Sequence, residues 1–459
     1  MKYISTRDNS KEYNFEQVFI KGLADDGGLF IPKSLKKFSD NELNSLSKLN
    51  YQDLAKKIIF PFIESFMSES ELSEIINKSY SVFRKDNVVN LIKIGDINVL
   101  ELFHGPTLAF KDIAMQLLGS FYEHHLNKNN KSINVIVATS GDTGAAAIDA
   151  IKGKKNMNIF VLHPHNKVSI VQRKLMSTVK DKNVFNIAIE GNFDDCQNLV
   201  KSMFSDKKFS NSINMSGVNS INWARIIAQA VYYFYTYFLL KNKKSINFSV
   251  PTGNFGDVYA GYLSKKMGLP INKLIVATNK NDILHRAISK GIYKAETVFE
   301  TISPSMDIQI ASNFERLIYD LNNHDDVETK NIMIEIKKKG KYIIPKEKIE
   351  KIKKNFLSAS MNEEEVLITI KEVYEKYKII LDPHSAIGFG ALRKLEIDGN
   401  NVVLATAHPC KFPDAINRSI KFRPNLPNEL KYVLDEKENY DIISNDLKKV
   451  TEYIKGKIQ

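Results

Sequence analysis

The sequence contains one lysine whose neighbours would suit covalent chemistry. Lys111 follows the apolar residues 108–110, and a Gly-Pro turn at 105–106 lies upstream of it. Apolar surroundings remove water from an ammonium group and lower its pKa, and the free amine forms Schiff bases with carbonyl groups. Because 65 residues are Lys or Arg, most of these cations are expected at the surface. Lys111 is singled out by two glycine-rich segments that follow it in the chain.

The first glycine-rich segment is 139–147, which follows an apolar run and opens a helical pattern rich in Gly and Ala. Free backbone N–H groups and the helix dipole at such a point favour an anion, and the hydroxyls of Thr139, Ser140 and Thr143 add donors. A capped turn without a ligand is the alternative, because a Ser-Gly-Asp sequence would also cap a helix. An anion site is the favoured interpretation.

The second glycine-rich segment is 250–257, which again leads from a predicted strand into a predicted helix. Gly253 and Gly256 permit positive φ angles and a nest of backbone N–H groups, which is how proteins cradle phosphates. The spacing fits neither the P-loop nor the dinucleotide-binding pattern. The interpretation as a phosphate site is strengthened because this is the second such segment in a chain that also has an apolar-flanked lysine.

The overall composition is that of a soluble globular protein, with 43% hydrophobic and 26% charged residues. The net charge of +12 could attract nucleic acid. However, the lysines are spread along the whole chain, and no RNA- or DNA-binding motif accompanies them. We therefore expect no nucleic-acid partner, and a basic RNA-binding protein on a degenerate enzyme scaffold is the alternative from another functional class.

Disulfides, metal sites and membrane spans are not expected. Cys196 and Cys410 have no paired spacing, and His163 and His165 lack a third ligand, so surface histidines are the favoured interpretation. The apolar run 224–240 is too short to span a membrane comfortably, and it contains an Arg and a Gln, so it predicts a buried helix. A cytoplasmic location is expected.

Strands and helices alternate through much of the 459-residue chain, which indicates an α/β protein with mostly parallel sheets. Residues 1–92 are expected to form an N-terminal helical unit. The expected strands are 99–103, 133–138, 159–162, 184–189, 246–250, 273–278 and 401–406. The expected helices are 113–125, 142–151, 168–179, 193–204, 217–240 and 255–267. The region 300–380 gives no clear pattern, and its lysine run at 337–341 predicts a solvated turn.

Six segments in the same order along the chain resemble those of threonine synthases. They are 22–32, 103–112, 139–147, 219–225, 250–257 and 406–412. The resemblance implies the fold of the tryptophan-synthase β group (fold type II), with two open, mostly parallel twisted sheets and flanking helices. It implies a large cofactor-binding domain of residues 93–111 and 216–459, and a small α/β domain of residues 112–215. Whether the protein is a monomer or a homodimer stays open.

The resemblance also implies pyridoxal 5'-phosphate as the cofactor. Lys111 would bind it covalently, and Thr406 would place its hydroxyl against the pyridine nitrogen. Asp142 would lie near the ring's 3-hydroxyl. The phosphate would be wrapped by the second glycine-rich segment, with Gly253, Asn254, Phe255, Gly256 and Asp257 as cofactor-binding residues.

The implied activity is that of a lyase acting on a small molecule in the final step of threonine biosynthesis. O-Phosphohomoserine and water would give threonine and phosphate through γ-elimination and β-hydration, with Lys111 as the base. The released phosphate or the cofactor phosphate could carry protons late in the reaction. The implied substrate-binding residues are Thr139, Ser140 and Thr143 toward the carboxylate, Arg225, Asn219 and Ser220 toward the phosphate, and Lys411 as a weaker candidate.

Two related activities compete with this one. A threonine-synthase-like phospholyase would expel phosphate and release 2-oxobutyrate and ammonia, and residue spacing does not separate it from a synthase. A serine or threonine dehydratase is disfavoured by the Asp142 motif and by the segment 103–112.

Overall fold

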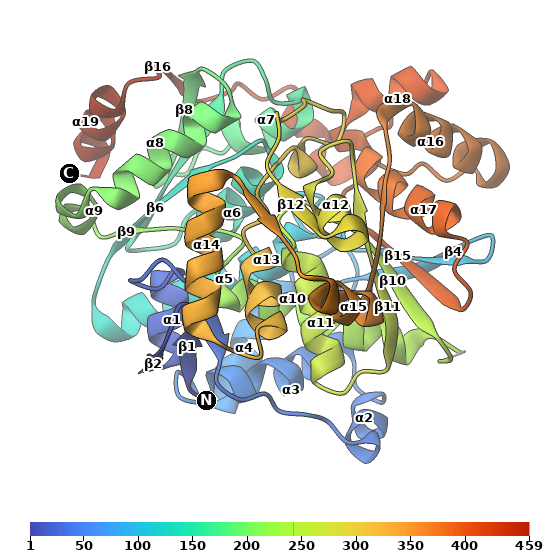
Figure 1. Ribbon diagram of the computed structural model, residues 1–459. Helices are drawn as coiled ribbons and strands as arrows, with labels where there is room; N and C mark the ends of the chain where they lie inside the picture. The colour runs from blue at the N-terminus through green and yellow to red at the C-terminus, as the bar shows by residue number, and fades with distance from the viewer. Residues whose placement is uncertain (242, 459) are drawn as a thin grey trace.

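The computed structural model describes residues 1–241 and 243–458, and two open sheets organise these residues (Figure 1). The larger sheet has six strands, and neighbouring strands are parallel except for the antiparallel pair β4 and β5. In spatial order its strands are β14 (Phe356–Ser360), β11 (Ile271–Thr278), β10 (Ile246–Pro251), β15 (Asn400–Ala405), β5 (Ile97–Glu101) and β4 (Asn90–Ile94).

The smaller sheet has five strands, all parallel to their neighbours. In spatial order they are β16 (Asp441–Ser444), β8 (Val184–Glu190), β7 (Met157–Pro164), β6 (Ile133–Ala138) and β9 (Met215–Ser216). The expected α/β fold with two open, mostly parallel sheets is confirmed. The C-terminal strand β16 hydrogen-bonds to β8, so the end of the chain returns to the smaller sheet instead of staying with the larger one.

Helices surround both sheets. Beside the smaller sheet lie α6 (Asp142–Ile151), α7 (Ile170–Ser177), α8 (Phe193–Ser205), α9 (Lys207–Ser212) and α19 (Leu447–Ile458). Nearer the larger sheet lie α10 (Trp223–Leu239), α11 (Gly256–Lys266), α12 (Ile283–Lys290), α16 (Glu363–Tyr377), α17 (Pro383–Leu395) and α18 (Pro413–Ile420). The helix α5 (Lys111–Asn129) packs against both α6 and α10, and it therefore connects the two halves.

The N-terminal unit contains a small sheet as well as the expected helices. Its helices are α1 (Phe15–Lys21), α2 (Asp40–Leu46), α3 (Tyr51–Ile63) and α4 (Glu69–Tyr80). Its strands, in the antiparallel order β2-β1-β3, are β2 (Asp8–Tyr13), β1 (Tyr3–Ser5) and β3 (Phe30–Pro32). The exposed strand β2 consists mainly of charged and polar residues with no apolar alternation, so the sequence pattern does not predict a strand there.

The region 300–380, which lacked a clear pattern, forms regular structure. It contains α13 (Phe314–Leu321), α14 (Asp326–Lys339), α15 (Lys346–Asn355), the strand β14 and all of α16. The predicted turn at 337–341 is wrong, because three of its lysines form the last turn of α14 and Gly340 ends that helix with a left-handed φ of 65°. Cations at a helix C-terminus oppose the helix dipole favourably. The short elements are an antiparallel two-stranded sheet of β12 (Ile292–Lys294) and β13 (Lys341–Ile343), and the 3₁₀ turns η1 (Pro304–Met306), η2 (Pro409–Lys411) and η3 (Asn428–Leu434).

The apolar run at 224–240 forms α10, a buried helix of the core, as expected. No helix within the described residues has both the length and the apolar character to cross a bilayer. The prediction of surface histidines is wrong for His163, which is 1% exposed at the end of β7.

Candidate active site

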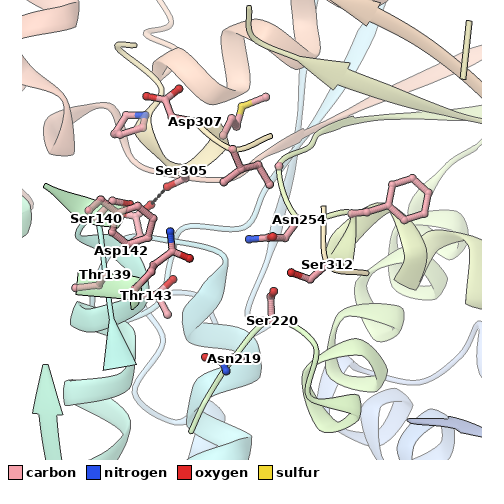
Figure 2. A pocket seen from close by; sticks show the side chains of 18 of the residues that line it. Thr139, Ser140, Asp142, Thr143, Asn219, Ser220, Asn254, Ser305, Asp307 and Ser312 are labelled. Atoms are coloured by element: carbon pink, nitrogen blue, oxygen red, sulfur yellow. Dashed lines mark hydrogen bonds between the residues drawn. The ribbon is translucent and has the colours of Figure 1, made fainter. Parts of the chain in front are cut away.

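A cavity of about 640 Å³ lies where the two sheets and α5 meet. Its walls come from the segments that follow β6, β10 and β15, from the first turns of α5, α6 and α10, and from residues 304–312. Ligands of α/β proteins bind at the carboxyl ends of parallel strands, and this cavity has that position. Figure 2 shows polar side chains from the two halves of the molecule facing one another across it, among them Ser140, Thr143, Ser220 and Asn254.

Lys111 is the first residue of α5 and lines this cavity. Its side chain is almost buried, and its Nζ lies 3.3 Å from Asp142 Oδ2 and 3.2 Å from Ser305 Oγ. Burial lowers the pKa of Lys111, Asp142 opposes this effect, and the cations Lys411 and Arg225 reinforce it. A cavity-facing amine with a lowered pKa has the properties of a nucleophile or a base.

Asp142 opens α6 and is held from both sides. Its Oδ1 accepts from Lys411 Nζ at 2.7 Å and from Gln172 Nε2 at 2.7 Å, while Oδ2 faces Lys111 and Ser305. Burial by itself would raise the pKa of Asp142, but Lys411, Lys111 and the nearby imidazole outweigh burial and bring this pKa well below its usual range. The carboxylate is therefore ionised at neutral pH.

The turn before α6 is held by the hydroxyl of Thr139. Gly141 has a φ of 135°, and the Thr139 hydroxyl accepts from the N–H groups of Gly141 and Gly144, each at 2.9 Å. Because this hydroxyl supports the turn, Ser140 and Thr143 are the partly exposed hydroxyls of the segment that face the cavity.

The turn before α11 differs from expectation in its backbone. The left-handed residue is Phe255, with a φ of 63°, whereas Gly253 and Gly256 do not have positive φ angles. The Phe255 ring is buried against Phe314, with ring centroids 5.3 Å apart, and this contact fixes the strained residue. Gly253 is needed for space, since a Cβ there would lie 2.8 Å from the Ser305 carbonyl oxygen.

Asp257, the second residue of α11, turns toward α10. Its Oδ1 accepts hydrogen bonds from Tyr232 at 2.5 Å and from Tyr233 at 2.9 Å, and its Oδ2 has no partner within the described residues. Burial raises the pKa of Asp257 to about 6, although the two tyrosine hydroxyls act in the opposite direction. This carboxyl group anchors the turn and titrates near neutral pH.

Arg225, in the first turn of α10, is 3% exposed and lines the cavity. One of its N–H groups donates to the Val218 carbonyl oxygen at 3.0 Å, and its Nε has no partner in the described part of the chain. Burial lowers the pKa of Arg225 to about 10. Among the described residues no carboxylate forms an ion pair with it. Asn219 and Ser220 line the cavity just before this helix, so the region offers a positive charge and polar groups to an anion.

Thr406 and Lys411 both follow β15, but only Thr406 lines the cavity. Thr406 lines the cavity, and its carbonyl oxygen accepts from the Phe110 N–H at 2.9 Å. Lys411 is fully buried, is not among the residues that line the cavity, and donates to Asp142 and to the Thr107 carbonyl oxygen at 2.7 Å each. It thus contacts the site through Asp142.

Several polar residues of the site were not found from the sequence. Ser305 comes from the region without a clear pattern, and its N–H donates to His384 Nε2 at 3.3 Å. The other ring nitrogen of His384 lies 2.8 Å from Asp382, the residue that caps α17. An Asp-Pro-His-Ser helix start before a helix of small and apolar residues was a usable signal for this buried histidine. Within the described residues no cluster of His, Cys, Asp and Glu could hold a metal ion.

Comparison with known proteins shows the family of this chain. The family model "Threonine synthase N terminus" matches residues 2–80, "Pyridoxal-phosphate dependent enzyme" matches 94–340, and "Threonine synthase, C-terminal" matches 385–454. Threonine synthase of Pseudomonas aeruginosa is 45% identical over 459 residues, covering 99% of this chain and 98% of the relative. That of Saccharomyces cerevisiae is 44% identical, covering 94% of this chain and 92% of the relative.

A solved structure gives the same result. The crystal structure of pyridoxal-phosphate-bound threonine synthase from Brucella melitensis superposes with a TM-score of 0.96 and 43% identity, and both chains are covered completely. The agreement extends over the N-terminal unit and both sheets. The chain therefore belongs to the threonine synthase family of pyridoxal-phosphate-dependent enzymes.

Proposed function

We propose that this lyase converts O-phosphohomoserine and water into threonine and phosphate. The observation that carries the proposal is that one cavity contains a desolvated amine, Lys111, and a buried guanidinium, Arg225, that has no acidic partner among the residues the structure describes. An amino-acid substrate with a phosphate group brings the negative charge that the guanidinium lacks, and family membership supports this substrate.

The residues of the cavity fit pyridoxal phosphate, the cofactor of the family. We assign Lys111 as the residue that binds it covalently. The turn 253–257 ends at the N-terminus of α11, where backbone N–H groups and the helix dipole suit a phosphate, and Gly253 leaves room for it. Thr406 would face the pyridine nitrogen and Asp142 the ring's hydroxyl. When bound, the cofactor takes up the electrons that are released at the substrate carbons.

The substrate contacts divide between the two halves of the molecule. Ser140 and Thr143, at the start of α6, suit the carboxylate of the substrate. Arg225, with Asn219 and Ser220, suits its phosphate. Thr139 supports this arrangement through its bonds to Gly141 and Gly144 rather than through the substrate.

Lys111 is the group that we assign to proton transfer. Its Nζ faces the cavity, and burial favours its neutral form, so it can accept a proton from a substrate carbon and return it. Arg225 remains charged throughout, which stabilises the phosphate as it leaves.

Product analysis tests the proposal. Purified enzyme with added cofactor and O-phosphohomoserine should give threonine and inorganic phosphate in equal amounts. Formation of 2-oxobutyrate and ammonia with phosphate would instead identify the alternative activity, that of a phospholyase. Absence of phosphate release would refute both activities, and the Lys111→Ala variant measures the background.

We further propose a division into structural parts and a location. The large cofactor-binding part is formed by 93–111 and 216–440, the smaller part by 112–215 together with the C-terminal segment that includes β16, and 1–92 is the N-terminal unit. The hydrogen bonds of β16 to β8 support the revised C-terminal boundary.

A cytoplasmic location is supported by two buried, unpaired cysteines. A monomer and a homodimer both fit the proposal.

A further inference from the structure

Two lysines share the single carboxylate of Asp142. Lys411 Nζ is 2.7 Å from Oδ1, whereas Lys111 Nζ is 3.3 Å from Oδ2. Only Lys111 reaches the cavity, because the Lys411 side chain is fully buried. The closer of the two cations is therefore the one that no ligand can touch.

The position of Lys411 is fixed by several contacts. Its ammonium group also donates to the Thr107 carbonyl oxygen at 2.7 Å, and its own carbonyl oxygen accepts from the Ser169 hydroxyl at 2.8 Å. Ser169 caps α7, the helix that carries Gln172, and Gln172 donates to the same carboxylate oxygen as Lys411. Asp142 Oδ1 is thus saturated by donors that do not take part in ligand binding.

The charge balance explains why such a contact matters. A neutral Lys111 is needed for attack on a carbonyl group and for accepting a proton. A buried carboxylate 3.3 Å away would by itself favour the ammonium form of Lys111, since an opposite charge at this distance shifts a pKa by about 1–3 units. Lys411 and Asp142 form an ion pair with no net charge. When Lys111 loses its proton, the three side chains together are therefore neutral.

We propose that Lys411 is the resident counter-ion of Asp142, a positioning residue that compensates the carboxylate and so leaves Lys111 free to lose its proton. The inference depends on the proposed function for its meaning, because Lys111 is assigned there as the reactive amine. The charge of Lys111 is measured without turnover, however, so the two proposals can fail separately.

Other charged groups near Lys111 and Asp142 also affect the protonation of these two side chains. Arg225 lines the same cavity and, as a cation, disfavours a charged Lys111, whereas His384 lies near Asp142 and favours its ionised form. Asp112, the next residue of α5, accepts from the Thr107 N–H at 2.8 Å, and burial raises its pKa to about 6 while Lys411 lowers it. These groups stay in place in the variants below, so differences between variants report on Lys411 and Asp142.

The test is competitive labelling of the full-length protein freed of cofactor. Acetic anhydride reacts only with neutral amines, and peptide mass spectrometry gives the labelling of Lys111 against pH, with the exposed Lys448 as an internal reference. In Lys411→Met the midpoint for Lys111 should move upward by about 1 pH unit or more. Lys411→Arg, which keeps the charge, should move it by less. An unchanged or lowered midpoint in Lys411→Met would overturn the proposal.

Two further variants keep the test decisive. The double variant Asp142→Asn/Lys411→Met removes both members of the pair, so its midpoint should return close to that of the wild type. A midpoint that falls well below the wild-type value in the double variant would show that Asp142 was not compensated and would refute the inference, even if Lys411→Met fails to fold. Lys154→Met removes a partly buried lysine that lies just after α6 and pairs with Glu123 of α5 at 2.6 Å, and it should leave the midpoint unchanged.

Discussion

The Phe110 N–H donates a hydrogen bond to the carbonyl oxygen of Thr406 at 2.9 Å. Next to it, Ala109 forms an isolated antiparallel bridge with Ala407, and the His408 N–H donates to Leu108 at 3.0 Å. The segment that precedes Lys111 is thereby paired to the segment that follows β15. This pairing fixes the lysine relative to Thr406, which lines the same cavity.

Replacing Lys111 by Ala should abolish activity while leaving the fold intact. The amine is the assigned base and covalent anchor, so turnover should fall at least about 100-fold, a typical contribution of acid–base catalysis. Mass spectrometry after borohydride reduction should find no cofactor attached. Lys128→Ala, in the exposed last turn of the same helix, is the matched control and should behave as the wild type. A fully active Lys111→Ala enzyme would refute the assignment.

Replacing Arg225 by Met should weaken phosphate recognition without weakening the fold. Loss of a charge-assisted hydrogen bond of about 1.5–3 kcal/mol should raise KM for O-phosphohomoserine by roughly 10- to 100-fold, with a smaller effect on kcat. Because the wild-type guanidinium is buried and has no acidic partner in the described part of the chain, the anion-free variant should melt no lower than the wild type. Steady-state kinetics and thermal melting measure both effects, and an unchanged KM would place the phosphate elsewhere.

The sequence predicts those parts of the site that local chemistry determines. Strand β6 and helix α6 appear with the expected bounds, since an apolar run, a Thr-Ser-Gly-Asp turn and a row of small residues each favour one structure. The helix after Lys111 was likewise expected. These elements and the turn between them place Lys111, Ser140 and Asp142, so this part of the cavity follows from local patterns.

The parts that sequence reasoning did not find depend on contacts between distant segments. Ser305 lies on a stretch without periodicity, and its place is set by His384 and by the space beside Gly253. The left-handed backbone at Phe255 was missed because glycine has the stronger preference for that region, whereas burial of the aromatic ring against Phe314 decides here. The pairing of Lys411 with Asp142 depends on tertiary structure alone.

The pH dependence of stability should reveal Asp257. Its pKa of about 6 in the folded protein lies above the ordinary value of 3.8, so the folded state binds this proton more tightly than the unfolded state does. The contribution of Asp257 is therefore most favourable below about pH 4 and is lost as the pH rises to about 6. Asp257→Asn removes this titration and should gain stability relative to the wild type between these values, by up to about 3 kcal/mol.

Chemical unfolding of wild type and Asp257→Asn at about pH 4 and pH 8 measures this difference. Asn can still accept the two tyrosine hydrogen bonds, which keeps the comparison close to isosteric. Asp446→Asn, at an exposed position before α19, is a control in which an acid with a lowered pKa is removed, and its trend should be the opposite. An identical pH dependence for wild type and Asp257→Asn would show that Asp257 does not titrate in this range.

Two glycines of the same turn should respond differently to Ala. A Cβ on Gly253 would lie 2.8 Å from the Ser305 carbonyl oxygen, which is backbone and cannot move alone, whereas a Cβ on Gly256 would meet the Asn313 side-chain nitrogen at 3.3 Å. Overpacking of this kind costs about 1–3 kcal/mol. Gly253→Ala should therefore displace Ser305 from its place beside Lys111 and weaken cofactor binding, measured by titration of the cofactor-free protein. Gly256→Ala is the matched control with the smaller loss. Equal losses of cofactor affinity in the two variants would show that the close approach of Gly253 to Ser305 does not determine this affinity.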